Sequence, residues 1–200
     1  MSAPILKTDI LFAQRLLSAA GLYKGKLDGL FNDALDQAET AFDKIGDDIA
    51  KASGRFDMRS EGAIATLLPK AQELARKFMK TAVTAPFQVK ILSGTRNYTE
   101  QNALFAKRPK VTNARGGQSN HNFGIAWDVG IFVDGKYLTG KNAKEDKAYA
   151  DLAALIKGAL QGIEWGGDWK TFKDAPHYQL ASGKSVAQIR ALFEKGKAYV

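Results

Sequence analysis

Cysteine is absent from the 200-residue chain, and histidine occurs only twice. The absence of cysteine excludes disulfide bonds, thiolate metal ligands and a cysteine nucleophile together. No apolar run approaches the roughly 18 residues that a membrane helix requires, so we expect no membrane insertion. The first nine residues lack the basic region and apolar core of a secretory signal. We therefore expect a protein made in the cytoplasm that, if it acts outside, leaves by another route.

Charge is spread unevenly along a chain of otherwise ordinary composition. Hydrophobic residues make up 45% and charged residues 25%, which is typical of a soluble protein with one domain and a small appendage. Residues 1–56 carry 7 basic and 8 acidic side chains, and residues 57–200 carry 22 and 13, so the net charges are −1 and +9. The basic part indicates a polyanionic partner, such as nucleic acid or an acidic cell-wall polymer, or charge for solubility alone. Since no basic helix, RNP-like aromatic motif or zinc finger is present, we expect no nucleic-acid partner.

Apolar periodicity and capping residues predict six helices. Asp9 and Thr99 are the expected N-caps of the first and fourth, and Pro69 suits the first turn of the third. The helices are expected at residues 9–21, from Asn32 or Asp33 to about 45, 69–83, 99–107, 145–160 and 185–195. Strands are expected at residues 87–92, 125–133 and 177–180, with a connector at 46–60 and a polar loop at 113–122. This mixture predicts an α+β fold in which helices flank a small antiparallel sheet.

The first histidine, His121, lies seven residues before Asp128, just ahead of a predicted strand. A turn at residues 122–124 would fold His121 back over that carboxylate. Alternation along the strand directs Asp128 away from the core and places it between two minimal side chains. The residues expected to face the core are Ile125, Trp127, Val129 and Ile131, and those beside Asp128 are Ala126 and Gly130. The carboxylate therefore has room beside it for a metal and a substrate.

The second histidine, His177, follows Pro176, which excludes a helix interior and places the histidine at the start of a strand. Asp174 would lie in the preceding loop, where a carboxylate could take a proton from water and return it to a leaving amine. Two imidazoles and a carboxylate are a donor set of hydrolytic zinc sites, which keep a fourth position open. The alternative is a pair of structural histidines satisfied by hydrogen bonds.

The spacing His-x6-Asp followed by an acidic residue-x-x-His resembles the LAS-type zinc peptidases of the M15 family. These include D-Ala-D-Ala dipeptidases and carboxypeptidases and the L-alanyl-D-glutamate endopeptidases of phage endolysins, and the sequence is most similar to the last group. The similarity spans roughly residues 57–195. The segments that carry it are residues 57–60, 65–67, 93–96, 112–117, 121–124 and 164–169.

The resemblance implies roles for individual residues. His121, Asp128 and His177 would bind zinc, and Asp174 takes the place of the catalytic carboxylate, which is Glu in many members. Because aspartate is one methylene shorter than glutamate, the loop that carries Asp174 must come closer to the metal, or the rate of catalysis falls. Arg96 matches the arginine that stabilises the oxyanion of the tetrahedral intermediate. Substrate contacts are expected from Ser119, Gln101, Arg115, Trp165 and Trp169. The alternatives are a surface ion pair for Arg96, a loop brace for Arg115 and core packing for the tryptophans.

The N-terminal helical region resembles the small peptidoglycan-binding domain attached to many cell-wall enzymes. The matching residues are Gln14, Asp28, Gly29, Phe31, Ala38 and Phe42. The chain departs from that family at Asn32, Leu35 and Asp43, and a third helix is not evident, so a two-helix packing appendage is the alternative. We therefore divide the chain into a peptidoglycan-binding-like region with its connector, residues 1–56, and a zinc peptidase domain, residues 57–200.

Taken together, the resemblances imply a monomeric zinc endopeptidase that cuts the L-alanyl-D-glutamate bond of the peptidoglycan stem peptide. The missing signal fits a phage or prophage endolysin that reaches the wall after a holin opens the membrane. Two alternatives stay open: a carboxypeptidase that removes terminal D-alanine, and a non-catalytic, zinc-containing wall-binding module. Asp174 and Arg96 argue against the second, because a purely structural metal site needs neither.

Overall fold

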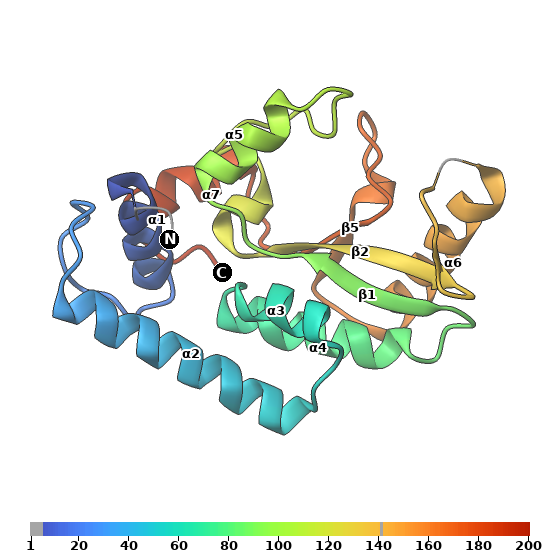
Figure 1. The fold of residues 1–200 in the computed structure, drawn as a ribbon, viewed down its shortest axis with the longest axis horizontal. Coiled ribbons are helices and arrows are strands. Elements are labelled where there is room, and N and C mark those ends of the chain that lie inside the picture. The colour runs from blue at the N-terminus through green and yellow to red at the C-terminus, as the bar shows by residue number, and fades with distance from the viewer. Residues whose placement is uncertain (1–5, 141) are drawn as a thin grey trace. The chain divides into compact units, whose positions relative to one another are not determined.

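The computed structural model describes residues 6–140 and 142–200. Residues 1–5, which open the segment examined for a secretory signal, and Lys141 lie outside the described residues. Within those two ranges the chain forms seven α-helices and a five-stranded antiparallel sheet (Figure 1), which confirms the predicted α+β class. Across the same ranges, no helix combines the length and the apolar character that spanning a membrane demands.

The chain divides into two compact units, each assembled from separate segments. The first comprises residues 1–48, 96–124 and 182–200, and the second comprises residues 49–95 and 125–181. The first unit therefore unites the N-terminal region with two later segments. The predicted division into residues 1–56 and 57–200 follows a different line and stays a prediction.

The second unit carries the sheet, whose strands run in the order β1-β2-β5-β4, with β3 paired to β2. The strands are β1 Gln88–Ser93, β2 Ala126–Val133, β3 Lys136–Tyr137, β4 Ile163–Trp165 and β5 His177–Leu180. The helices are α3 Met58–Ala65, α4 Pro69–Ala82 and α6 Ala143–Ala159, and a 3-10 turn, η2, covers Gly166–Asp168. Figure 1 shows β1 and β2 as long neighbours, with α3 and α4 lying along them.

One face of this sheet is covered by the core of the second unit. Pro69 occupies the first turn of α4, where its missing N–H costs nothing, and the helix then buries an apolar stripe. The rings of Phe78 on α4 and Tyr178 on β5 meet edge to face, with centroids 4.7 Å apart. Trp127, Val129 and Ile131 on β2 are fully buried in the same cluster, as predicted from strand alternation. The opposite face of β2 and β5 is thereby left for polar side chains.

The outer edge of β1 is sealed by α3 rather than by another strand. Asp57 caps α3 by accepting a hydrogen bond from the Ser60 amide at 3.2 Å. The Ser60 hydroxyl in turn accepts a hydrogen bond from the Ile91 amide of β1 at 3.0 Å. Behind α3, Glu61 holds the buried Arg76 of α4 through two bonds of 2.9 and 2.8 Å. The sheet edge and the two helices are therefore tied together by polar groups.

Helices dominate the first unit. Its elements are α1 Lys7–Ala19, α5 Tyr98–Ala106, the 3-10 turn η1 Asn120–Phe123, α7 Val186–Phe193 and most of α2 Asp33–Ser53. An aromatic cluster joins them, with the Phe123 ring of η1 5.3 Å from the Phe193 ring of α7. Tyr199 reinforces this contact by donating a hydrogen bond to the carbonyl of Phe123. The turn that carries His121 is thus anchored to the C-terminal segment.

The residues that resemble a peptidoglycan-binding domain have structural roles in the first unit. Gln14 is buried, and its amide oxygen accepts a hydrogen bond from the Gly29 amide at 2.8 Å. Its amide nitrogen donates to Asp28 at 3.1 Å, so Gln14 holds the turn between α1 and α2. Phe42 is buried on α2, whereas Phe31 and its neighbour Leu30 are 58% and 57% exposed. The turn therefore presents two apolar side chains to solvent.

Several predicted boundaries were wrong. Helix α1 begins at Lys7, so Asp9 lies in its first turn, and α5 is capped by Asn97, which forms a capping box with Glu100, rather than by Thr99. The predicted connector at 46–60 is helix as far as Ser53, followed by the start of α3. Helix α2 continues through Gly46 because its buried stripe resumes at Ala50, and one helical glycine costs only about 1 kcal/mol. The short strands β3 and β4 were not predicted.

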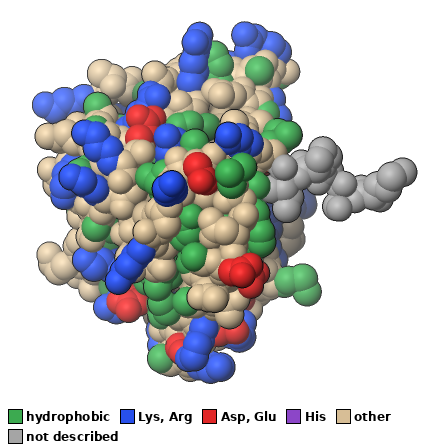
Figure 2. All heavy atoms as spheres, turned by 90° about the vertical axis from the view of Figure 1, so that its left-hand side faces the viewer, with side chains coloured by type: hydrophobic (Ala, Val, Ile, Leu, Met, Phe, Trp, Pro, Cys, Tyr) green, Lys and Arg blue, Asp and Glu red, His purple; other side chains and the backbone are tan. Residues whose placement is uncertain are grey.

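Basic side chains are dispersed on the face drawn in Figure 2. Lys and Arg side chains (blue) stand among uncharged and hydrophobic ones rather than forming one patch. No histidine is visible on that face, in keeping with the burial of both imidazoles. This face therefore offers no concentrated site for a polyanion.

Candidate metal centre

Sheet register places Asp128 and His177 directly opposite each other on β2 and β5. The next pair along, Trp127 and Tyr178, is fully buried in the core. Because side chains alternate between faces, Asp128 and His177 both project from the other face. His177 Nδ1 lies 3.3 Å from Asp128 Oδ1. The geometry of this pair is therefore set by the sheet and not by a flexible loop.

His121 is held in η1 by a dense set of hydrogen bonds. The Ser119 side chain caps the turn, accepting a hydrogen bond from the His121 amide at 3.4 Å. The His121 carbonyl accepts one from the Arg96 amide at 3.0 Å, and the Asn122 side chain donates to the Arg96 carbonyl at 2.8 Å. Gly124 ends the turn in the left-handed conformation, with φ of 67°, which glycine adopts without strain. The backbone of the turn that carries His121 is thereby held in place.

His121, Asp128 and His177 each offer one ligand atom, and these atoms all lie within 4.8 Å of one another. Both histidines are nearly buried, with exposed fractions of 2% and 4%. Two atoms each about 2.1 Å from one tetrahedral zinc ion lie roughly 3.4 Å apart. The 3.3 Å separation of His177 Nδ1 and Asp128 Oδ1 fits that spacing. Two imidazoles and one carboxylate are a donor set of zinc sites, and the Asp128–His177 pair has the separation that such a site needs.

The neighbours of His177 also favour a positive charge at this position. Burial alone would lower its pKa, but the hydrogen bond and charge of Asp128 raise it, and so do the Gln179 hydrogen bond and the Asp174 charge. The net effect raises the pKa of His177 above its ordinary value. A metal cation would take the place of that proton and satisfy the same negative surroundings.

The loop that carries Asp174 is built around Gly166 of η2. The Asp174 amide donates to the Gly166 carbonyl at 3.1 Å, and the His177 amide donates to the Asp174 carbonyl at 3.1 Å. A Cβ atom at position 166 would lie 2.5 Å from the Asp174 carbonyl oxygen and 3.0 Å from His177 Cβ. Only glycine therefore admits this close approach. Asp174 acts on His177 through its charge, and its predicted role as general base stays a prediction.

The two tryptophans of this region have different surroundings. The Trp169 ring packs against the His177 imidazole, with centroids 4.9 Å apart. Trp165 donates its indole N–H to the Ala175 carbonyl at 2.7 Å and carries the Lys157 ammonium over its ring at 5.3 Å. Trp165 therefore braces the loop before His177, while Trp169 flanks the imidazole of a candidate metal ligand.

The remaining predicted substrate contacts lie on or beside the loop from α5 to η1. Gln101 is buried and donates a hydrogen bond to the Ala114 carbonyl at 2.9 Å. Arg115 is exposed, with its guanidinium carbon 4.9 Å from the centroid of the Phe105 ring. These contacts brace the loop, as the alternative for Arg115 proposed. Contacts of Gln101, Arg115, Ser119, Trp165 and Trp169 with substrate, and of Arg96 with an oxyanion, stay predictions.

Sequence reasoning missed three residues that shape the centre: Gln179, Asn122 and Gly166. Gln179 lies two residues beyond His177, and strand alternation alone indicates that it shares the histidine's face. Asn122 and Gly166 carry no comparable signal, because each acts through a contact with a distant part of the chain.

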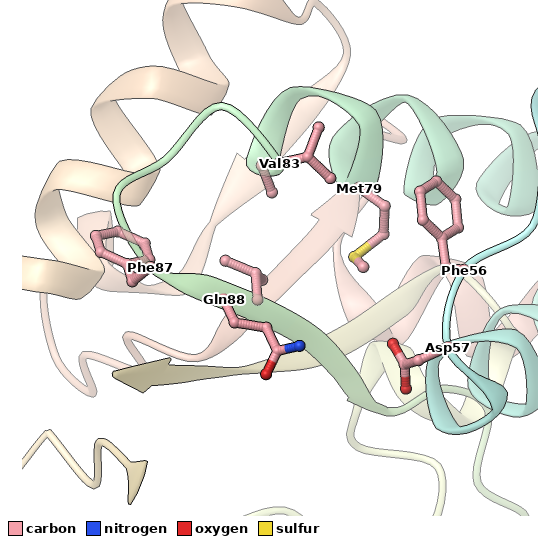
Figure 3. A pocket seen from close by; sticks show the side chains of 8 residues that line it. Phe56, Asp57, Met79, Val83, Phe87 and Gln88 are labelled. Carbon is pink, nitrogen blue, oxygen red and sulfur yellow. The ribbon is translucent and has the colours of Figure 1, made fainter. Parts of the chain in front are cut away.

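A pocket of about 330 Å³ in the second unit is separate from these residues. It lies between the end of α4 and the start of β1 (Figure 3). The side chains of Met79, Val83 and Phe87 form apolar walls, and Asp57 stands at one end. None of the predicted site residues lines it, so we do not assign the chemistry to this pocket.

Comparisons with known proteins identify the family of this chain. Residues 112–180 match the model of a peptidase M15 family described as D-alanyl-D-alanine carboxypeptidase. The chain is 36% identical over 126 residues to the peptidoglycan L-alanyl-D-glutamate endopeptidase CwlK of Bacillus subtilis, an alignment that covers 57% of this chain and 73% of CwlK. It is also similar to the crystal structure of the L-Ala D-Glu endopeptidase ChiX of Serratia marcescens, with 28% identity, a TM-score of 0.49, and 63% and 89% of the two chains covered. The extent of the match to CwlK places this chain in the M15 family of metallopeptidases.

Proposed function

We propose that this chain is a zinc-dependent endopeptidase that hydrolyses the L-alanyl-D-glutamate bond of peptidoglycan stem peptides. The observation that carries the proposal is the cluster of His121, Asp128 and His177, in a chain whose relative CwlK has that activity. When bound, zinc supplies Lewis-acid activation of water and of the scissile carbonyl. The two histidines and Asp128 would hold it.

The other residues act on the substrate and on the proton. Asp174, in the loop that ends at His177, takes a proton from the attacking water and returns it to the leaving amine. Arg96, whose backbone is bonded to the His121 and Asn122 segment, offers a fixed positive charge to the developing oxyanion. Trp169, packed on the His177 ring, provides an apolar wall beside the reacting peptide.

A second candidate activity is removal of the terminal D-alanine. The observation that favours it is the family match over residues 112–180, whose description is D-alanyl-D-alanine carboxypeptidase. Both reactions need the same metal centre, so the difference lies in the part of the stem peptide that the surrounding loops accept. The third reading, a non-catalytic wall-binding module, would retain the metal but release no product.

Digestion of purified peptidoglycan, followed by mass analysis of the products, separates these activities. New amino termini at D-glutamate that disappear with a chelator and return with zinc support the endopeptidase. Loss of D-alanine alone supports the carboxypeptidase, and zinc binding without any product overturns both. An Asp128→Asn variant should lose zinc and activity together, whereas Asp151→Asn, an exposed change on α6, is the matched control.

We further propose that the N-terminal helical region, residues 1–56, assists attachment to the wall and that the enzyme acts as a monomeric endolysin, released by a holin-type route. The exposed Leu30 and Phe31, held by the Gln14 turn, support a role in attachment. A Phe31→Ala variant should sediment less with insoluble peptidoglycan while cleaving soluble muropeptides at an unchanged rate. Sedimentation equilibrium of the protein tests the monomer.

A further inference from the structure

Gln179 occupies a position on β5 from which it reaches both a metal-binding histidine and a carboxylate. It is 8% exposed and lies two residues after His177, so the two side chains share a face of the sheet. Its partner on β2 is the fully buried Ala126, and its partner on β4 is Glu164. All four residues belong to the second unit.

Two hydrogen bonds fix the orientation of the Gln179 amide. Its nitrogen lies 2.6 Å from Glu164 Oε2, and its oxygen lies 3.0 Å from His177 Nε2. A carboxylate accepts hydrogen bonds, so Glu164 requires the amide nitrogen on its side. The amide oxygen must then face the imidazole, and since that oxygen is only an acceptor, His177 Nε2 must carry the hydrogen.

A neutral imidazole with a hydrogen on Nε2 has its lone pair on Nδ1. Nδ1 is the nitrogen that lies 3.3 Å from Asp128 Oδ1, on the side of the ligand cluster. Histidines that bind metals commonly donate their other N–H to a carboxylate or carbonyl, which orients the ring and selects the ligating nitrogen. Here the acceptor is a neutral amide, and the carboxylate stands one residue further away.

We propose that Gln179, itself oriented by Glu164, is a positioning residue that holds His177 with Nε2 protonated and so presents Nδ1 to the metal. This inference rests on the proposed zinc centre and adds the relay Glu164–Gln179–His177 to it. Neither Gln179 nor Glu164 touches the metal or the substrate in this role. The relay holds the His177 imidazole in one orientation and in one tautomer.

The direct test is NMR of 15N-histidine protein loaded with 113Cd²⁺ as the metal probe. Only two histidines contribute signals, and coupling between cadmium and nitrogen identifies each ligating atom. The wild-type protein should show coupling to His177 Nδ1 together with a slowly exchanging Nε2–H. Coupling to His177 Nε2 would overturn the proposal outright.

Variants then separate positioning from folding. Gln179→Met keeps the length of the side chain but cannot accept the hydrogen bond, so the Nε2–H signal should be lost and zinc affinity should fall about 10- to 100-fold. Gln88→Met is the matched control, since it makes the same change at the exposed first residue of β1. Unchanged affinity and tautomer in Gln179→Met would refute the role of Gln179.

Glu164 gives a second route that does not alter a buried residue, because its side chain is exposed. Glu164→Leu should release the Gln179 amide to rotate and weaken the Nε2–H signal, whereas Glu164→Gln keeps an acceptor oxygen and should restore it. A Glu164→Leu protein with an unchanged signal would remove Glu164 from the relay. Failure of the proposed function is distinguishable, because in that case the wild-type protein itself would not bind zinc or cleave peptidoglycan.

Discussion

Gly166→Ala tests whether the close approach of η2 to the Asp174 loop sets the geometry of the metal centre. The new Cβ would lie 2.5 Å from the Asp174 carbonyl oxygen and 3.0 Å from His177 Cβ, whereas ordinary contacts begin at 3.4 Å. The carbonyl must therefore retreat by about 0.9 Å and His177 Cβ by about 0.4 Å. The two contacted atoms belong to Asp174 and His177, so the clash would displace these two site residues directly.

Two effects of different size should follow. Overpacking of this kind costs about 1–3 kcal/mol, and at roughly 2–4 °C per kcal/mol for a chain of this length the melting temperature should fall by roughly 2–12 °C. Misplacement by about 1 Å near the reacting groups costs on the order of 100-fold in rate. Activity should thus fall well below the level that lost stability explains.

The assay compares muropeptide cleavage, zinc affinity and thermal melting of Gly166→Ala with those of Gly62→Ala. Position 62 lies in α3, and a Cβ there meets nothing within 4 Å, so the control carries the same substitution without a clash. If Gly166→Ala matched the control in both turnover and melting temperature, the close approach would have no role in the site.

Two further changes probe the general base and the buried ion pair. Asp174→Ala should lower turnover by about 100-fold or more, while bound zinc, measured by elemental analysis, stays at the wild-type level. The control is Asp168→Ala, a change at an exposed residue. Near-normal turnover of Asp174→Ala would exclude Asp174 from the mechanism. Arg76→Met should lower the free energy of unfolding, measured with urea at pH 7, by about 1.5–3 kcal/mol, because Glu61 loses two charge-assisted hydrogen bonds and keeps only the Phe56 amide and Arg55 as partners. Burial of Glu61 raises its pKa, but Arg76 and the Phe56 amide outweigh burial and lower it from 4.5, so the pair stabilises the fold above pH 4.5 and ceases to do so as the pH falls through the lowered pKa. The difference between the two proteins should therefore shrink in acid, and a constant difference would contradict this account.

The part of the site that lies on strands was accessible from the sequence. Apolar residues at alternate positions around Asp128 predicted the outward projection of its side chain from β2, and Pro176 predicted that β5 begins at His177. The α+β class was also predicted correctly, because apolar periodicity in a long segment distinguishes a helix from a strand. Local rules were sufficient wherever one element decided the outcome.

Features that depend on contacts between distant segments were not accessible. Strand β4 has only three residues, which is too few to show an alternating pattern, yet it places Glu164 beside Gln179. Gly46 suggested the end of the second helix, but α2 continues to Ser53 because Ala50 is buried. Thr99 and Asn97 are both capping residues, and only the reciprocal bond of Asn97 with Glu100 distinguishes them. In the first two cases a tertiary contact selects the outcome, whereas the capping box of Asn97 with Glu100 is a local contact.

The pairing of Asp128 with His177 across β2 and β5 has a consequence for how the chain can vary. Their separation depends on strand register, and a slip of one residue would turn either side chain to the opposite face. In the segment between them, β4, η2 and the Asp174 loop contact β5 or His177, whereas β3 and α6 carry none of the site residues. Insertions and deletions are therefore expected to accumulate among relatives outside β4, η2 and the Asp174 loop, whereas a single inserted residue inside β2 or β5 would move both the metal-site residue and its buried neighbours to the wrong face.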